Sequence, residues 1–222
     1  MFNIVELCII FTIYSLFAIF CAIFHIIKKE YLRKIIKCCP LLILIISLII
    51  KNPTNWMPYT AFIFGCLGDA LLIPRTKKLF LLGTISFLIQ HIILFVYLVL
   101  GNAFLFASPI FYIVIVLFEA VHIIVFIRFM KIRAQKVLTI LGAIYTAVLV
   151  LNLVTPIFIS ISTSSLLPLL MTLGYISYSF SDSLIILRNV HIDFPKHRDL
   201  WVIITYYLAQ IILFIYIIIP LL

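Results

Sequence analysis

The chain has 222 residues, of which 66% are hydrophobic and only 10% are charged, and its mean hydropathy is +1.36. Soluble proteins carry about 25% charged residues, so this composition excludes a soluble globular domain and predicts an integral membrane protein. The formal net charge of +9 is explained by membrane topology and anionic lipid, without a nucleic-acid partner.

Hydrophobic segments of about 20 residues recur along the whole chain, separated by short polar or basic breaks. They predict eight membrane spans, at residues 4–27, 36–50, 58–73, 79–100, 108–127, 137–155, 163–187 and 200–219. The first segment lacks a preceding basic stretch and a small-residue cleavage site, so we interpret it as a retained helix and not as a signal peptide. The prediction is an all-α bundle that forms a single transmembrane domain over residues 1–222.

Basic residues lie almost entirely in alternate breaks between the predicted spans. The breaks after the first, third, fifth and seventh spans hold five, three, four and three of them, and only Lys51 lies elsewhere. Because cytosolic loops are enriched in Lys and Arg, this alternation predicts an even number of spans, with both termini on the non-cytosolic side.

Two aspartates, Asp69 in FGCLGDALLI and Asp182 in YSFSDSLIIL, lie inside hydrophobic spans. A charged group in the hydrocarbon region costs about 2.5–3.5 kcal/mol even on insertion scales, so it persists mainly where it faces an interior and has a function. Each aspartate precedes an arginine, Arg75 or Arg188, by six residues. At about 1.5 Å per residue, both carboxyl groups lie about 9 Å inside the same boundary. We therefore expect the two aspartates to act together.

Further polar side chains fall at a similar depth and predict a polar pocket that opens toward the cytosolic leaflet. They are Gln90, His91, Glu119, His122, Tyr145, Tyr206, Tyr207 and Gln210. Glu119 and His122 are spaced i, i+3, so they can also simply hydrogen-bond one another.

Two pairs of similar segments lie four spans apart. GDALLIPR in the third span parallels SDSLIILR in the seventh, and HIILFVY (91–97) parallels QIILFIY (210–216). These pairs predict two parallel repeats, about 1–101 and 102–222, related by an axis along the membrane normal.

Several of these motifs, in this order and on these spans, resemble the lysoplasmalogenase (YhhN-like) family of eight-helix membrane proteins. They are Gly68-Asp69 in the third span, the FLLG…H…Y pattern of the fourth (Phe80 to Gly83, His91, Tyr97), Ser181-Asp182 in the seventh, and YYLAQ (206–210) in the eighth. The resemblance implies hydrolysis of the vinyl ether bond of a lysoplasmalogen to a fatty aldehyde and glycerophosphoethanolamine or glycerophosphocholine, without a metal or organic cofactor. It also suggests an endomembrane such as the endoplasmic reticulum.

This chemistry suits a pair of carboxyl groups. Protonation of the β-carbon of a vinyl ether gives an oxocarbenium ion, which water captures as a hemiacetal that collapses to aldehyde and alcohol. Two carboxyl groups in a low-dielectric site do not both ionise cheaply, so one is expected to donate the proton while the other stabilises the cation and orients water. The sequence leaves open which of Asp69 and Asp182 has which of these catalytic roles.

The other polar residues are expected to orient the carboxyl groups or to bind the lysophospholipid. The first role is predicted for His91, Tyr145, Tyr206, Tyr207, Gln90 and Gln210. Arg75 and Arg188, or the nearby Lys77 and Lys78, are predicted to attract the headgroup phosphate. Anchoring at the membrane interface explains these basic residues equally well.

Two other functions fit membrane carboxylates. A small transporter or proton-coupled carrier would use them equally well, and transport into sealed vesicles without chemical change would identify it. An intramembrane aspartyl protease also uses paired aspartates, but Cys66 replaces a glycine of its Gly-x-Gly-Asp motif, and the Pro-Ala-Leu motif is missing. No metal site is predicted, because the five cysteines show no ligand spacing with histidines and are interpreted as buried free thiols.

Overall fold

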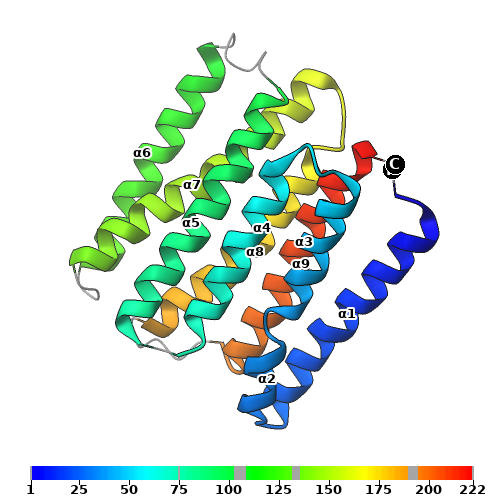
Figure 1. The fold of residues 1–222 in the computed structure, drawn as a ribbon. Helices are drawn as coiled ribbons and strands as arrows, with labels where there is room; N and C mark the ends of the chain where they lie inside the picture. Colours follow the sequence, from blue (N-terminus) through cyan, green and yellow to red (C-terminus); the bar gives the residue numbers. More distant parts are fainter. Residues whose placement is uncertain (1, 75, 103–108, 132–135, 190–194, 222) are drawn as a thin grey trace.

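The computed structural model describes residues 2–74, 76–102, 109–131, 136–189 and 195–221, and helices account for most of these. Eight long helices and one short helix, α2, form a bundle, and no strand occurs in the described ranges (Figure 1). The helices are α1 (Ile4–Ile26), α2 (Glu30–Ile36), α3 (Cys39–Lys51), α4 (Trp56–Leu72), α5 (Lys77–Leu100), α6 (Pro109–Lys131), α7 (Lys136–Thr163), α8 (Leu169–Asn189) and α9 (Arg198–Ile218), followed by a 3-10 turn, η2 (Ile219–Leu221). The prediction of an all-α bundle of eight long helices is confirmed.

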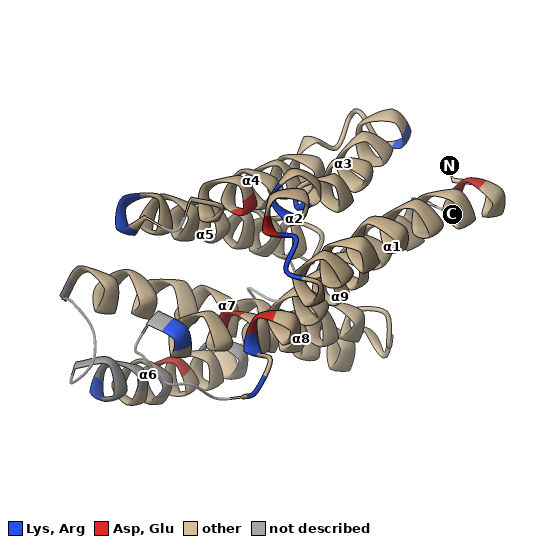
Figure 2. Cartoon of the chain, turned by 90° about the horizontal axis from the view of Figure 1, so that it is seen from below, with Lys and Arg blue, Asp and Glu red and all other residues tan. Residues whose placement is uncertain are grey.

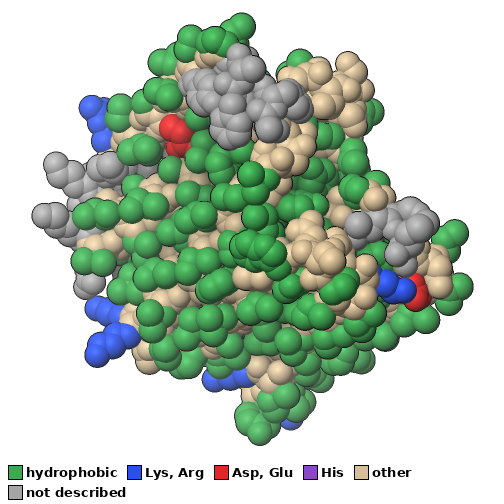
Figure 3. All heavy atoms as spheres, turned by 45° about the horizontal axis from the view of Figure 1, so that its top comes forward, with side chains coloured by type: hydrophobic (Ala, Val, Ile, Leu, Met, Phe, Trp, Pro, Cys, Tyr) green, Lys and Arg blue, Asp and Glu red, His purple; other side chains and the backbone are tan. Residues whose placement is uncertain are grey.

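The outer surface of the bundle is hydrophobic, as expected for a protein surrounded by lipid. Hydrophobic side chains cover most of the face in Figure 3, and charged side chains are few. Ile4 is 81% exposed and Ile110 68% exposed. By length and composition, α1, α5, α7, α8 and α9 can each cross a membrane, which indicates a multi-pass membrane protein. The helices α3 and α4 are shorter, with 13 and 17 residues.

The two termini lie at the same end of the bundle (Figures 1 and 2). At the opposite end, helices α1, α4 and α8 finish, and α2, α5 and α9 begin. The described helix ends that flank the predicted basic breaks therefore gather at one end, and Lys51, at the end of α3, lies at the other. The orientation of this bundle relative to the cytosol stays a prediction.

Two segments differ from the sequence expectation. Residues 30–35, predicted to lie in a basic break, form α2 together with Ile36, the predicted start of the second span, and Arg33 pairs there with Glu30 one turn earlier at 2.5 Å. The chain then turns into α3, which has Pro40 in its first turn, where proline is tolerated. Helix α7 continues to Thr163, eight residues beyond the predicted span, with Pro156 inside it. Membrane helices tolerate such a proline when neighbouring groups satisfy the freed backbone.

Close packing of α4 against α5 and of α8 against α9 forms the centre of the bundle. Glycines make these approaches possible, because a Cβ at Gly68 would lie 2.8 Å from the Phe87 ring and one at Gly174 would lie 2.9 Å from Leu213. The predicted sequence repeat equates α4 with α8 and α5 with α9, and it stays a prediction.

We expect Gly65→Ala to lower the free energy of unfolding by about 1–3 kcal/mol, the usual cost of overpacking. A Cβ at Gly65 would lie 2.5 Å from Oε1 of Gln90, a fully buried side chain that hydrogen-bonds Tyr178 and Gln210 and so cannot turn away freely. Denaturant unfolding in detergent micelles measures the loss. The control is Gly101→Ala, where the nearest atom is 3.6 Å from the Cβ position. Equal stability of Gly65→Ala and wild type would contradict this packing.

Candidate functional site

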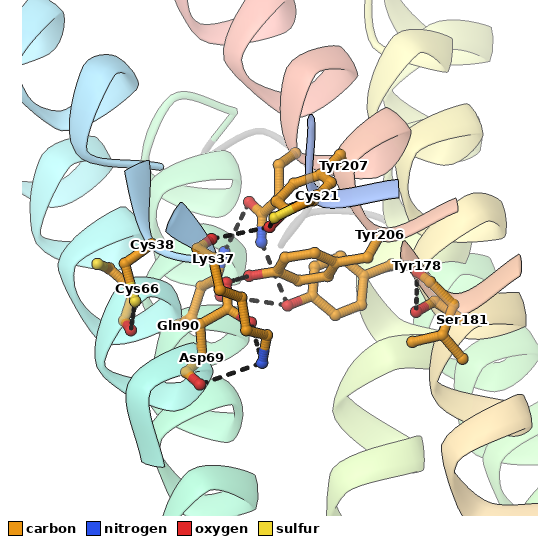
Figure 4. A network of polar contacts seen from close by, with 12 residues as sticks. Cys21, Lys37, Cys38, Cys66, Asp69, Gln90, Tyr178, Ser181, Tyr206 and Tyr207 are labelled. Atoms are coloured by element: carbon orange, nitrogen blue, oxygen red, sulfur yellow. Dashed lines mark hydrogen bonds and ion pairs between the residues drawn. The ribbon is translucent and has the colours of Figure 1, made fainter. Parts of the chain in front are cut away.

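Asp69 lies near the end of α4 and is buried, with a side chain that is only 3% exposed. Lys37, the residue that follows α2, places its Nζ 3.0 Å from Oδ1 of Asp69 and donates to the Asp69 backbone carbonyl at 3.1 Å. The hydroxyl of Tyr206 on α9 donates to Oδ2 at 2.7 Å. Figure 4 shows how these side chains converge. Asp69 therefore has a cation and a hydroxyl group as partners.

Asp182 lies on α8 and has a different set of partners. The hydroxyl of Tyr145 on α7 donates a short hydrogen bond to Oδ2 of Asp182, and the same hydroxyl lies 3.1 Å from Nε2 of His91 on α5. His91 is fully buried, and the rings of Tyr145 and Tyr178 lie 5.5 Å and 4.4 Å from its ring, centre to centre. Among the described residues, no cation lies within ion-pair distance of Asp182.

The two glutamines form a polar cluster with Tyr178 in the interior of the bundle. Gln90 of α5 donates to Gln210 of α9 at 3.2 Å, and Tyr178 of α8 donates to Gln90 Oε1 at 3.3 Å. Gln210 in turn donates to the Tyr178 hydroxyl at 3.3 Å. All three side chains are buried. The cluster links α5, α8 and α9 and contacts neither carboxyl group directly; the Tyr178 ring lies 5.6 Å from that of Tyr206, the tyrosine that binds Asp69.

Tyr207 supports Lys37 and does not touch a carboxyl group. Its hydroxyl donates to the Lys37 carbonyl at 2.8 Å and lies 3.4 Å from Sγ of Cys21 on α1. The hydroxyl of Tyr14, also on α1, donates to the Tyr207 carbonyl at 2.6 Å. These contacts join α1 and the α2–α3 connection to α9.

Asp69 and Asp182 line one cavity at the basic end of the bundle, whose empty volume is about 860 Å³ when the space open to solvent is included. In the described part of the chain, no hydrogen bond joins the two carboxyl groups, and each has its own partners. Arg188 lines the same cavity, 3.6 Å from Asp199. Arg75 lies outside the described residues. Lys77 and Lys78 are exposed and do not line this cavity.

Other predicted features lie away from this cavity. Glu119 lies half-buried on α6, a helix that packs mainly on α7, and it does not line the cavity. The side chain of His122 lies outside the described residues.

The expectation that all the cysteines are buried is wrong. All five are free thiols, but only Cys21 is fully buried, and Cys8 is exposed. Within the described ranges, no group of three or more His, Cys, Asp or Glu side chains could hold a metal ion.

The sequence of this chain matches the model of one known protein family. The model of the YhhN family matches residues 32–216, from within α2 almost to the end of α9. The chain belongs to the YhhN family. This is the family of lysoplasmalogenases, and the matched segment contains Lys37 and both aspartates. Helix α1, with Tyr14 and Cys21, lies before the segment that matches the YhhN family. No curated protein and no solved structure matched the chain.

Lys37 and Tyr178 are two residues of the site that were not predicted from the sequence. Lys37 was counted with the other basic residues of the first break, and nothing in that break distinguishes it from its neighbours. Tyr178 could have been predicted from the sequence, because it lies four residues before Asp182 and therefore on the same face of the helix.

Proposed function

We propose that this protein hydrolyses the vinyl ether bond of lysoplasmalogens in an endomembrane such as the endoplasmic reticulum. The products are a fatty aldehyde and glycerophosphoethanolamine or glycerophosphocholine. The observation that carries the proposal is that Asp69 and Asp182 line one cavity but have different partners. Membership of the YhhN family supports the same activity.

The partners suggest which carboxyl group has which role. An ammonium group 3.0 Å from Asp69 stabilises negative charge on that carboxylate. Among the described residues, the partner of Asp182 is a tyrosine hydroxyl and not a cation, and on the side of α7 its surroundings are mostly apolar, where a neutral carboxyl group costs less than a charged one. We therefore assign Asp182 as the general acid and Asp69 as the general base.

The reaction needs only water and these two groups. The Asp182 carboxyl group gives its proton to the β-carbon, the C=C bond becomes a C–C bond, and the positive charge forms on the adjacent carbon and its ether oxygen. Asp69 stabilises this cation and accepts a proton as water adds to it. The hemiacetal proton then moves to the glycerol oxygen as the C–O bond breaks. The proton held by Asp69 restores the acid form of Asp182, so the cycle closes without an oxidant or reductant.

Tyr145 and His91 act as positioning residues in this scheme. The Tyr145 hydroxyl occupies Oδ2 of Asp182, and no hydrogen-bond partner for Oδ1 exists among the described residues. Oδ1 is therefore the oxygen that we assign to proton transfer. The hydrogen bond between Tyr145 and the buried His91 restricts the hydroxyl to one orientation.

Purified protein should release fatty aldehyde from a 1-O-alkenyl lysophospholipid and leave the 1-O-alkyl analogue intact. The two lipids differ only in the double bond, which the proposed protonation requires. Coupled aldehyde oxidation or mass spectrometry measures the product. Cleavage of both lipids, or of neither in a correctly folded sample, would contradict the proposal.

A further inference from the structure

A second cavity lies on the other side of Asp182. Its empty volume is about 590 Å³ when the space open to solvent is included, and it extends among α4, α5, α7 and α8. Leu72, Phe87, Asp182 and Ile185 line both cavities. The two spaces are therefore neighbours, and Asp182 lies at their junction, whereas Asp69 lines only the first.

The two cavities differ in charge. Four basic side chains line the first one: Arg33, Lys34, Lys37 and Arg188. In the second, Asp182 is the only charged residue among the described lining residues, and most of the others are hydrophobic. A molecule that fills both spaces needs one anionic polar end and one hydrocarbon end.

Helix α2 carries two basic side chains, Arg33 and Lys34, that line the first cavity but bind neither Asp69 nor Asp182. Lys37 is bound to Asp69 at 3.0 Å, and Arg188 lies near Asp199 at 3.6 Å. Arg33 binds Glu30 through Nε and Nη2, and Nη1 has no partner among the described residues. Lys34 is exposed and forms no ion pair within the described ranges. Figure 2, which looks onto this end of the bundle, shows α2 near its centre, beside α4 and α1.

We propose that a lysophospholipid binds across both cavities, with its phosphate on Arg33 and Lys34 and its hydrocarbon chain in the second cavity. This inference rests on the proposed function. Arginine and lysine are the side chains that bind phosphate best, through charge-assisted hydrogen bonds. The ether bond of such a lipid lies between its phosphate and its chain, and this pose places it beside Asp182, at the junction. The phosphate site is thus assigned to α2.

The test of the phosphate site compares two substrates on one pair of variants. For Arg33→Gln/Lys34→Gln, we expect the KM of a 1-O-alkenyl glycerophosphocholine to rise about tenfold or more, the effect of losing charge-assisted contacts. The KM of the phosphate-free 1-O-alkenylglycerol and both kcat values should stay unchanged. Lys28→Gln/Lys29→Gln removes the same charge from exposed residues that do not line the cavity, and it should change neither KM.

A further variant tests whether the effect comes from the charges of Arg33 and Lys34 or from a disturbed fold of α2. Glu30→Gln removes the partner of Arg33 but keeps both cations, so it should not raise the KM of the phospholipid. An equal KM change for both substrates, or none for the phospholipid, would overturn the inference while the proposed function stands. A wild type that cleaves neither substrate would overturn the proposed function itself.

The proposed site for the hydrocarbon chain of the lipid has its own test. Thr84 lines the second cavity, and Thr84→Phe should reduce kcat/KM for a long-chain alkenyl lipid about tenfold more than for a short-chain one, because the ring takes up space for several methylene groups. Thr146→Phe, on α7 and lining neither cavity, should not change the ratio between chain lengths. A ratio that stays constant in Thr84→Phe would contradict this part of the pose.

Discussion

Asparagine in place of either Asp69 or Asp182 should reduce kcat for aldehyde release by at least about a hundredfold, within the range that general acid and base groups contribute. The amide has nearly the same shape as the carboxyl group, but it neither donates an acidic proton nor carries a negative charge. In Asp182→Asn the protonation of carbon is lost. In Asp69→Asn the cation loses the carboxylate that stabilises it and the group that accepts a proton from water. Aldehyde release by purified variants in detergent or nanodiscs measures both.

The control for this experiment is another carboxyl group of the same bundle. Glu6 lies at the opposite end and pairs with Lys51 at 2.5 Å, so Glu6→Gln should retain the wild-type kcat. The unfolding transition of each variant must be recorded, because Asp69→Asn also leaves Lys37 without its partner. Wild-type turnover in a folded Asp182→Asn protein would exclude this residue as the acid.

Lys37→Met should lower the free energy of unfolding by about 3 kcal/mol, because it leaves the Asp69 carboxylate buried without a cation. This value is at the lower end of the range for broken buried pairs, since the side chain of Lys37 is 22% exposed whereas that of Asp69 is 3% exposed. The double variant Lys37→Met/Asp69→Asn removes both charges and should regain much of the lost stability. It should not regain activity. Denaturant unfolding of the three proteins in one detergent measures these differences.

A second ion pair of the same chemical type provides the comparison. Lys51 and Glu6 are more exposed, at 24% and 34%, so water screens their charges and Lys51→Met should destabilise the protein less than Lys37→Met. An equal loss of stability for the two lysine variants would show that burial of Asp69 does not determine the effect. Failure of the double variant to regain stability would show that Lys37 contributes by packing and not by charge.

The architecture was predictable because two independent patterns in the sequence agree. Hydrophobic segments long enough to span a membrane recur along the chain, and the basic residues fall in every second break. The ends of the helices were less predictable. Pro156 is an ordinary signal for the end of a helix, but α7 continues past it, as membrane helices can where their surroundings satisfy the freed backbone group. Helix α2 was missed because seven residues are too few to give a hydrophobic period that stands out.

The site was predictable only in part. Asp69 and Asp182 could be predicted as site residues from the sequence, because a carboxyl group in hydrocarbon is costly. Tyr145 and Tyr206 could be predicted because they lie at the same depth in the membrane. Their pairing was not predictable, because depth does not say which helices are neighbours: Tyr206 binds Asp69 from 137 residues away, whereas Tyr145 binds Asp182. The role of Lys37 depends on a turn between α2 and α3 that directs its side chain inward.

Two consecutive residues of α9 bind the two members of the central ion pair. Tyr206 binds the Asp69 carboxylate, and Tyr207 binds the backbone of Lys37. One helix therefore holds both halves of the ion pair, the carboxylate through Tyr206 and the backbone of the lysine through Tyr207. The ammonium group and the carboxylate keep their places only while α9 keeps its own position between α4 and the α2–α3 connection.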